Sequence, residues 1–260
     1  LTTTGTNFNE FHKNLLKAIE RGLTKENALA ALTINPAKLL GTEKYAGTLE
    51  KGKFANLFVV SGESYFSKNV SIHSTWVKGT PFIHHVQETE KNDDGDINAS
   101  KQKSDILIAQ SPSKYRKPIN KSASILFTNA TIWTCAREGK MKNGEILIEN
   151  GKISAIGKTL KGLDRSKIKL IDLQGKHISP GIIDCHSHAM ILGRVNESTL
   201  PSTAMVRIED VINSESINIE RQLAGGVTVC NLLHGSANPI GGQNAVIKLR
   251  LGNSPENLLI

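Results

Sequence analysis

Two histidines separated by one residue are the side chains of this sequence best suited to chemistry. His186 and His188 end an apolar run that starts at Gly181. If this run forms a β-strand, alternate side chains share a face, so both imidazoles and the carboxylate of Asp184 point the same way. Two imidazoles that converge at a strand end can bind a divalent metal such as zinc. On spacing alone, a chance pair on a surface strand is the commoner explanation, because short motifs match often.

The segments on both sides of the pair favour the metal site. Turn-forming residues at 179–181 come just before the expected strand 181–188. After it we expect a long loop at 189–206, a helix at about 209–224 and a strand at 226–233, the order in which a (β/α) barrel begins. Asp184 could then orient an imidazole as a second-layer acceptor, or it could fix the floor of the barrel. The sequence favours neither role.

Short β-strands are predicted in two separate parts of the sequence. Over 44–86, glycines separate short segments, and the run 57–60 is typical of a buried strand. Over 122–178, alternating apolar segments include an Asn-Gly hairpin turn at 150–151. Apolar residues at helical spacing predict helices ahead of the first set, one of them capped by Thr24.

Residues 87–121 differ from both sets because they carry many charges and few large apolar side chains. Such a segment cannot bury enough surface to order itself, so we predict a linker. Residues 106–108 are an apolar exception and could add an edge strand.

Several of these segments resemble the amidohydrolase superfamily of metal-dependent hydrolases. HISPGIIDCHSHA (177–189) is similar to the first barrel strand of that superfamily, and NGEILIENGKISAIGK (143–158) to the small β-domain that precedes the strand. LAGGVTVCNLLHGSANPIGGQNAVIKLR (223–250) resembles the second strand and its loop in the imidazolonepropionase-like branch.

The early part of the sequence resembles the other end of such a protein. ALAALTINPAKLLGTEKYAGTLEKGKFANLFVVSG (28–62) is similar to the last barrel helix and the strands that return to the small β-domain, with Asn56 where the family usually carries aspartate. SIHSTWVKGTPF (71–82) resembles the closing strand. A single unit would need circular permutation to give this order, so a junction between two tandem units is the simpler interpretation. The expected boundaries are 1–43 for the end of the first barrel, 44–86 for its β-strands, 87–121 for the linker, 122–178 for the second β-domain and 179–260 for the start of the second barrel.

The resemblance implies an α/β fold made of partial TIM (β/α) barrel pieces with a composite small β-sandwich domain. It implies a metal-dependent hydrolase that attacks carbon–nitrogen bonds, non-peptide or cyclic amides, through a metal-activated water. One or two divalent ions, most simply zinc, would be held by His186 and His188 with Asp184 behind them. The remaining ligands and the catalytic base are expected beyond Ile260, so the piece itself should be inactive. The alternatives are a heterocycle deaminase of the same superfamily and a scaffold of this fold that has lost its metal.

The candidate substrate-binding residues follow the two predicted barrel strands. His234 falls at the carboxyl end of the second strand, where barrel enzymes place their sites, and opens a glycine-rich loop that includes Asn238 and Gln243. Arg194 lies in the long loop after the first strand, and such loops often carry function. Each of these residues is equally compatible with a solvated loop.

Composition limits the partners. The net charge of +8 comes from scattered lysines, with no basic stripe interleaved with aromatics, so we expect no nucleic acid. No stretch approaches the roughly 20 apolar residues that span a bilayer, so we expect no membrane partner. The three cysteines are far apart and odd in number, which does not indicate a disulfide framework. A small-molecule substrate is the expected partner, a homo-oligomer is an open alternative, and the compartment stays open.

Overall fold

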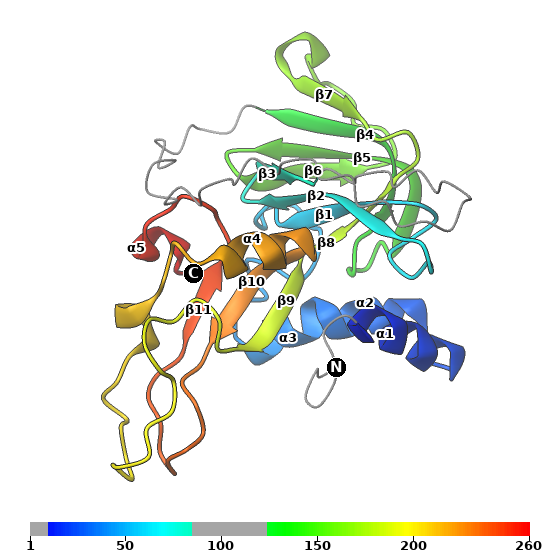
Figure 1. The fold of residues 1–260 in the computed structure, drawn as a ribbon. Coiled ribbons are helices and arrows are strands. Elements are labelled where there is room, and N and C mark those ends of the chain that lie inside the picture. Colours follow the sequence, from blue (N-terminus) through cyan, green and yellow to red (C-terminus); the bar gives the residue numbers. More distant parts are fainter. Residues whose placement is uncertain (1–9, 85–123) are drawn as a thin grey trace, which may run out of the picture.

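The computed structural model of the chain describes residues 10–84 and 124–260 (Figure 1). A large β-sheet lies next to a smaller sheet, with short helices beside both. The expected linker at 87–121, with its possible strand at 106–108, falls outside the described residues.

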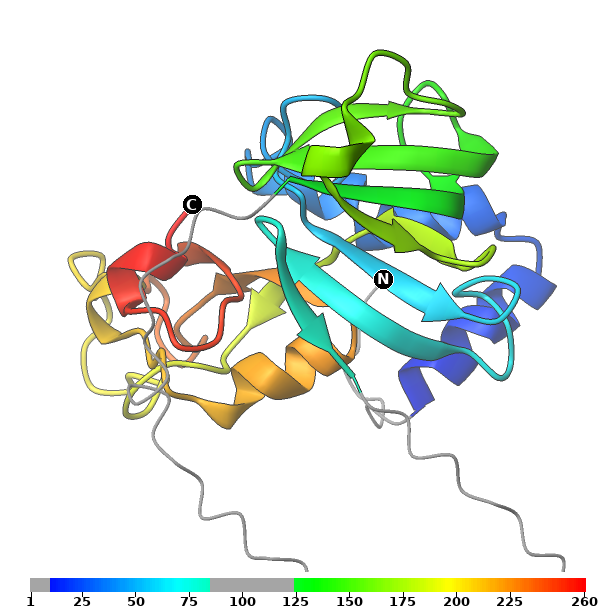
Figure 2. The same ribbon diagram turned by 90° about the horizontal axis from the view of Figure 1, so that it is seen from above.

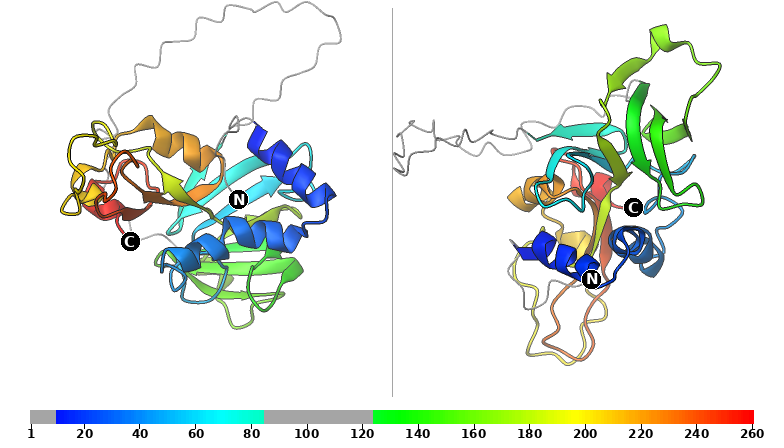
Figure 3. Two further views of the ribbon diagram at one scale, coloured as in Figure 1. Left: turned by 90° about the horizontal axis from the view of Figure 1, so that it is seen from below. Right: turned by 90° about the vertical axis from the view of Figure 1, so that its right-hand side faces the viewer.

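Three helices come first in the described chain: α1 (Phe11–Glu20), α2 (Lys25–Leu32) and α3 (Ile34–Leu39). As predicted, the side chain of Thr24 caps α2 by accepting a hydrogen bond from the backbone of Asn27 at 3.1 Å. The helices run along one side of the molecule when it is seen from below (Figure 3). Their buried side chains share a core with residues of both sheets: Leu15, Leu29 and Leu32 with Phe58, Val60 and Ile182.

The large sheet takes strands from both predicted sets (Figure 2). Its order is β3-β2-β1-β8-β4-β5-β6, and β7 pairs with β4. The described residues 44–84 and 124–178 therefore build one β-domain together, and the tandem arrangement of units stays a prediction. The strands are β1 (Leu57–Ser61), β2 (Ser71–Val77), β3 (Thr80–Ile83), β4 (Ile125–Trp133), β5 (Lys140–Glu149), β6 (Lys152–Gly157), β7 (Lys169–Asp172) and β8 (His177–Pro180).

The two sets of strands meet along β1 and just ahead of it. Antiparallel pairing sets Leu57 of β1 opposite Pro180 of β8. Just ahead of β1, the backbone of Ala55 donates to the carbonyl of Gly151 at 2.9 Å. The sheet therefore curls back on itself, and its inner face forms one apolar core that includes Leu57, Val59, Trp76, Phe127, Ile132, Ile146, Ile153 and Ile178.

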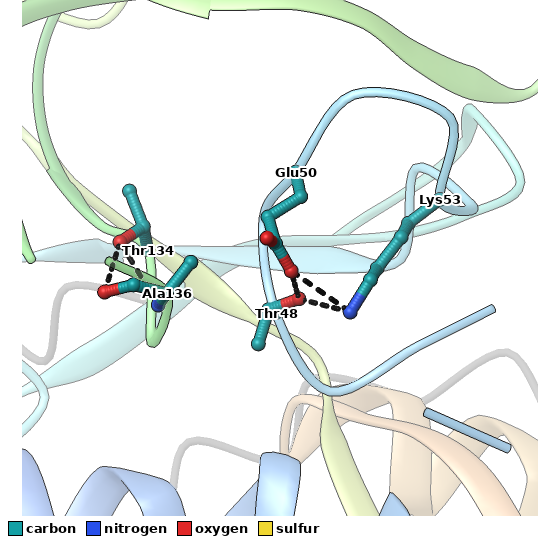
Figure 4. A network of polar contacts seen from close by, with 5 residues as sticks. All are labelled: Thr48, Glu50, Lys53, Thr134 and Ala136. Carbon is teal, nitrogen blue, oxygen red and sulfur yellow. Dashed lines mark hydrogen bonds and ion pairs between the residues drawn. The ribbon is translucent and has the colours of Figure 1, made fainter. Parts of the chain in front are cut away.

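A polar network fixes the loop ahead of β1 (Figure 4). The hydroxyl of Thr48 donates to a carboxylate oxygen of Glu50 at 2.5 Å, and Lys53 forms an ion pair with the same carboxylate at 2.9 Å. These contacts lower the pKa of Glu50, the Thr48 hydrogen bond most strongly. Leu49 lies between Thr48 and Glu50 in the sequence. Its backbone N–H donates to the carbonyl of Thr134 at 2.8 Å, which ties the loop to the end of β4.

The expected single closing strand at 71–82 is wrong in detail, because this segment is the β2–β3 hairpin. Its two-residue turn is Lys78-Gly79, with φ of 48° and 71°. Positive φ at both turn residues is the conformation that matches the twist of the flanking strands. The Asn-Gly turn at 150–151 was correctly predicted and joins β5 to β6 with φ of 51° and 76°.

The small sheet has three strands: β9 (Ile182–Ser187), β10 (Val227–Leu232) and β11 (Ala245–Lys248). β9 and β10 are parallel and joined through helix α4 (Ile217–Ala224), which is one β/α unit of the expected kind. β11 is antiparallel to β10, a strand that the sequence pattern did not predict. The described residues thus show a mixed α/β fold, and a full barrel remains an expectation from the family resemblance. A short helix, α5 (Pro255–Leu258), follows β11.

Helix α4 begins at Ile217 and not near residue 209 as expected. A single 3₁₀ turn (Ile208–Val211) stands in the predicted first part. The side chain of Asn213 accepts from the backbone of Glu215, and the hydroxyl of Ser216 accepts from Asn218 at 3.3 Å to cap the helix. Local side-chain acceptors of this kind compete with helix continuation, which explains the later start.

Across the described residues, no helix is both long and apolar enough to cross a bilayer.

Candidate metal centre at the end of strand β9

Strand β9 presents both predicted histidines at its carboxyl end. Ile182 and Ile183 in its first half are buried against the helices, whereas His186 and His188 are exposed. Their Nε2 atoms lie 3.3 Å apart, with ring centroids 5.0 Å apart and ring planes at 90°. The spacing i, i+2 therefore brings the imidazoles together, as the strand periodicity predicted.

The geometry of this pair fits two ligands of one zinc ion. Two nitrogens bound at about 2.0–2.1 Å in tetrahedral geometry lie roughly 3.3 Å from each other. The Nδ1 atom of His188 lies 2.8 Å from the carbonyl oxygen of Leu233. A carbonyl only accepts, so in this contact Nδ1 carries the hydrogen and Nε2 presents its lone pair. Metal-binding histidines commonly hold their second ring nitrogen in this way.

Asp184 supports the strand end through the backbone. A carboxylate oxygen of Asp184 accepts from the backbone N–H of His186 at 3.2 Å. Burial raises the pKa of Asp184, and hydrogen bonds from His186 and the Ser187 hydroxyl oppose that rise. The expected contact with an imidazole stays a prediction, since the hydrogen bond present here goes to the main chain.

Asn231 braces the same strand end, and sequence reasoning missed it. Its side-chain amide donates to the carbonyl of Cys185 at 3.2 Å, across from β10 to β9. Its oxygen accepts from the side chain of Asn244 at 2.5 Å, and Asn231 itself is buried. A polar residue inside the apolar run VTVCNLL was the available signal, because a buried amide needs partners. Cys185 is half-buried beside it.

His234 lies two residues past the end of β10, as predicted, but its ring is held by its own loop. Nδ1 lies 2.7 Å from the carbonyl of Gly235, and Nε2 accepts from the backbone N–H of Gly242. A Cβ on Gly241 would lie 1.3 Å from the ring, so that glycine permits the close approach. His234 thus shapes the loop, and its predicted contact with substrate is untested.

The loops after β9 and β10 pair with each other and extend together away from the large sheet (Figure 1). The backbone of Thr203 donates to the carbonyl of Ile240 at 2.8 Å, and that of Gln243 to Val206 at 2.7 Å. The side-chain amide of Asn238 donates to the hydroxyl of Thr203 at 2.9 Å, which ties the second loop to the first.

The remaining substrate-binding candidates lie on these loops in different settings. The Gln243 amide lies 3.4 Å from the carbonyl of Ala204, and Arg194 is exposed on the first loop. The Oδ1 atom of Asn238 is buried without a hydrogen-bond partner.

Within residues 10–84 and 124–260, no group of three or more histidine, cysteine or acidic side chains could hold a metal. His186 and His188 are therefore at most part of a ligand set.

Comparisons with known proteins show a resemblance to amidohydrolases. The model of the amidohydrolase family matches residues 1–82. Amidohydrolase tasK of Hapsidospora irregularis is 30% identical over 118 residues, which are 42% of this chain and 12% of that protein. A 5'-deoxyadenosine deaminase of Methanosarcina acetivorans is 29% identical over 41% of this chain and 27% of its own length. An imidazolonepropionase of Bacillus mycoides is 30% identical over 34% of this chain and 26% of its own length.

A solved amidohydrolase of Thermotoga maritima is 37% identical, covering 52% of this chain and 36% of that protein, with a TM-score of 0.46. The chain thus spans about a quarter or less of the length of these curated relatives. The resemblance to amidohydrolases that the sequence motifs predicted is confirmed by the family model over residues 1–82 and by these relatives. Members of this family are hydrolases that act on carbon–nitrogen bonds.

Proposed function

We propose that this chain supplies His186 and His188 as ligands of a divalent metal, most simply zinc, in an enzyme that hydrolyses carbon–nitrogen bonds. The supporting observation is the 3.3 Å separation of the two Nε2 atoms, with Nδ1 of His188 committed to the carbonyl of Leu233. A zinc ion bound there would lower the pKa of a water ligand to about 7 and polarise a substrate carbonyl. The substrate would be a small non-peptide amide, open or cyclic.

The residues of this chain would prepare the site. Leu233 fixes the tautomer of His188, and Asn231 holds the β9 backbone between the two ligands. We assign substrate contacts to the paired loops, through Asn238, Gln243, His234 and Arg194. The further ligands and the base that activates water would come from residues outside this sequence.

Deamination of a heterocycle is the second candidate, because one relative is named 5'-deoxyadenosine deaminase. Both reactions use a metal-bound water, so the metal alone does not separate them. Ammonia released from an aminopurine would favour the deaminase, whereas ring opening of a cyclic amide without ammonia would favour the amide hydrolase. A full-length protein that binds no metal and does neither would support the scaffold alternative.

The test uses the full-length protein and removes both ligands. A His186→Ala/His188→Ala variant should lose bound zinc, measured as metal per protein by mass spectrometry, and lose hydrolysis. A matched His73→Ala/His84→Ala variant removes two imidazoles from the large sheet and should keep both. Full zinc content in the first variant would overturn the proposal.

A further inference from the structure

A group of cations lies where the large sheet meets the small sheet. Lys248 ends β11, Arg250 follows it, and Lys78 belongs to the β2–β3 turn. Lys248 and Arg250 are each only 7% exposed. Burying a charge is costly unless an opposite charge accompanies it, so such a group calls for a counter-charge.

Within the part of the chain that the structure describes, no ion pair joins a carboxylate to Lys78, Lys248 or Arg250. Burial, and then the charges of Lys78 and Arg250, lower the pKa of Lys248 to about 8. Burial, and then the charges of Arg250 and Lys152, lower the pKa of Lys78. The cations therefore act on one another without compensation.

Neutral groups satisfy only some of the donors. The ammonium group of Lys248 donates to the carbonyl of Leu259, and Nη2 of Arg250 donates to the hydroxyl of Thr80 at 2.8 Å. The Nζ atom of Lys78 lies 4.9 Å from the centroid of the Phe54 ring. These acceptors hold the side chains in place but bring no negative charge.

Two buried N–H donors beside this group have no partner. One is Nε of Arg250 and the other is Nδ2 of Asn56. The Oδ1 atom of Asn56 accepts from the backbone of Lys78 at 2.9 Å, which places the second donor next to the Lys78 turn. Buried donors without partners are rare and point to a missing acceptor.

We propose that Lys78, Lys248 and Arg250 bind a small oxyanion such as phosphate or a carboxylate. An oxyanion supplies both the negative charge and the acceptor atoms that the cluster lacks, and the guanidinium of arginine suits such groups. A doubly charged ion should bind more tightly than a singly charged one, because three neighbouring cations act on one another here. Lys248 pairs with Val229 at the start of β10, whereas the histidine pair lies past its end, so this site is separate from the metal centre.

The probe is inorganic phosphate, titrated into the full-length protein by calorimetry at constant ionic strength, with acetate and chloride as parallel titrants. We expect saturable phosphate binding, weaker acetate binding and no chloride response. Lys248→Met removes one buried cation and should weaken phosphate binding by about tenfold or more, as expected when a charge-assisted contact is lost. The matched control Lys169→Met removes an exposed lysine of β7 and should bind as the parent does.

A second variant changes charge without changing size. Asn56→Asp places a carboxylate beside Lys78, so it should compete with the added ion and weaken phosphate binding as Lys248→Met does. If acetate binds as tightly as phosphate, the oxyanion that suits this site is a carboxylate. Absence of saturable binding of either ion, or unchanged phosphate affinity in both variants, would overturn the proposal.

Discussion

The Nδ1 atom of His188 lies 2.8 Å from the carbonyl oxygen of Leu233, the residue that follows β10. This contact crosses from one parallel strand to the next. It leaves Nε2 of His188 facing Nε2 of His186 at 3.3 Å. The hydrogen bond thus selects which nitrogen is free, so the site is prepared by the backbone of the neighbouring strand.

We therefore predict that neutral His188 is the Nδ1–H tautomer in metal-free protein. Long-range proton–nitrogen correlation spectra, recorded at a pH where the imidazole is neutral, distinguish the two tautomers. Adding zinc should shift the Nε2 resonance and leave Nδ1 protonated. A dominant Nε2–H form before zinc is added would contradict the geometry.

Gly181 marks a close approach between the start of β9 and β10. A Cβ there would lie 2.1 Å from the hydroxyl oxygen of Thr228 and 2.3 Å from its methyl group. Gly181→Ala should lower the free energy of unfolding by about 1–3 kcal/mol, the usual range for overpacking. Denaturant titration measures the loss. Gly157→Ala is the control, because its nearest contact would be 3.4 Å from Leu160, and an equal loss in both variants would argue against the clash.

Lys248 predicts a specific pH dependence of stability. Its pKa falls from 10.5 to about 8 in the fold, first through burial and then through Lys78 and Arg250. Between these values the unfolded chain binds a proton that the folded chain does not, so stability rises with pH across this window and is lost as pH falls through it. Urea unfolding in phosphate-free buffer at several pH values from 8 to 10 measures the slope.

The pH dependence of the free energy of unfolding is best compared between variants, because other lysines titrate in the same pH range. The parent protein should gain stability over this range relative to Lys248→Met. Lys169→Met should follow the parent. Parallel curves for all three proteins would show that Lys248 has an ordinary pKa.

The two described parts of the chain should hold together without a covalent link. β1 pairs with β8, Ala55 bonds to Gly151, and the helices share a core with Ile182. Cleavage at a single protease site inserted between residues 85 and 123 should leave both pieces in one peak on gel filtration. Leu57→Lys places a charge in the shared core and should separate them, whereas Lys51→Ala, an exposed change in the same loop region, should not.

Sequence patterns located the histidine pair and most strands because these depend on local periodicity. The alternation of side chains along a strand placed His186 and His188 on one face, and the pair Asn150-Gly151 predicted the hairpin turn that it forms. The Thr24 cap was also visible, since capping involves residues three apart.

Other features depend on contacts between distant residues and could not be predicted this way. The antiparallel β11 is defined by its pairing with β10, a contact between strands that no local pattern encodes. The cation group joins Lys78 to Lys248 and Arg250, more than a hundred residues away along the chain. The later start of α4 reflects competition by Asn213 and Ser216, which periodicity alone does not weigh.

The order of strands also has a consequence during synthesis on the ribosome. β1 lies between β2 and β8, yet β8 begins 120 residues after β1 (177 − 57). At about 5–20 residues per second, translation of that interval takes roughly 6–24 s. Meanwhile one edge of the apolar strand LFVVS has no native neighbour and is open to pairing with other nascent chains. A chaperone that shields the emerging hairpin over this interval should therefore raise the yield of folded protein.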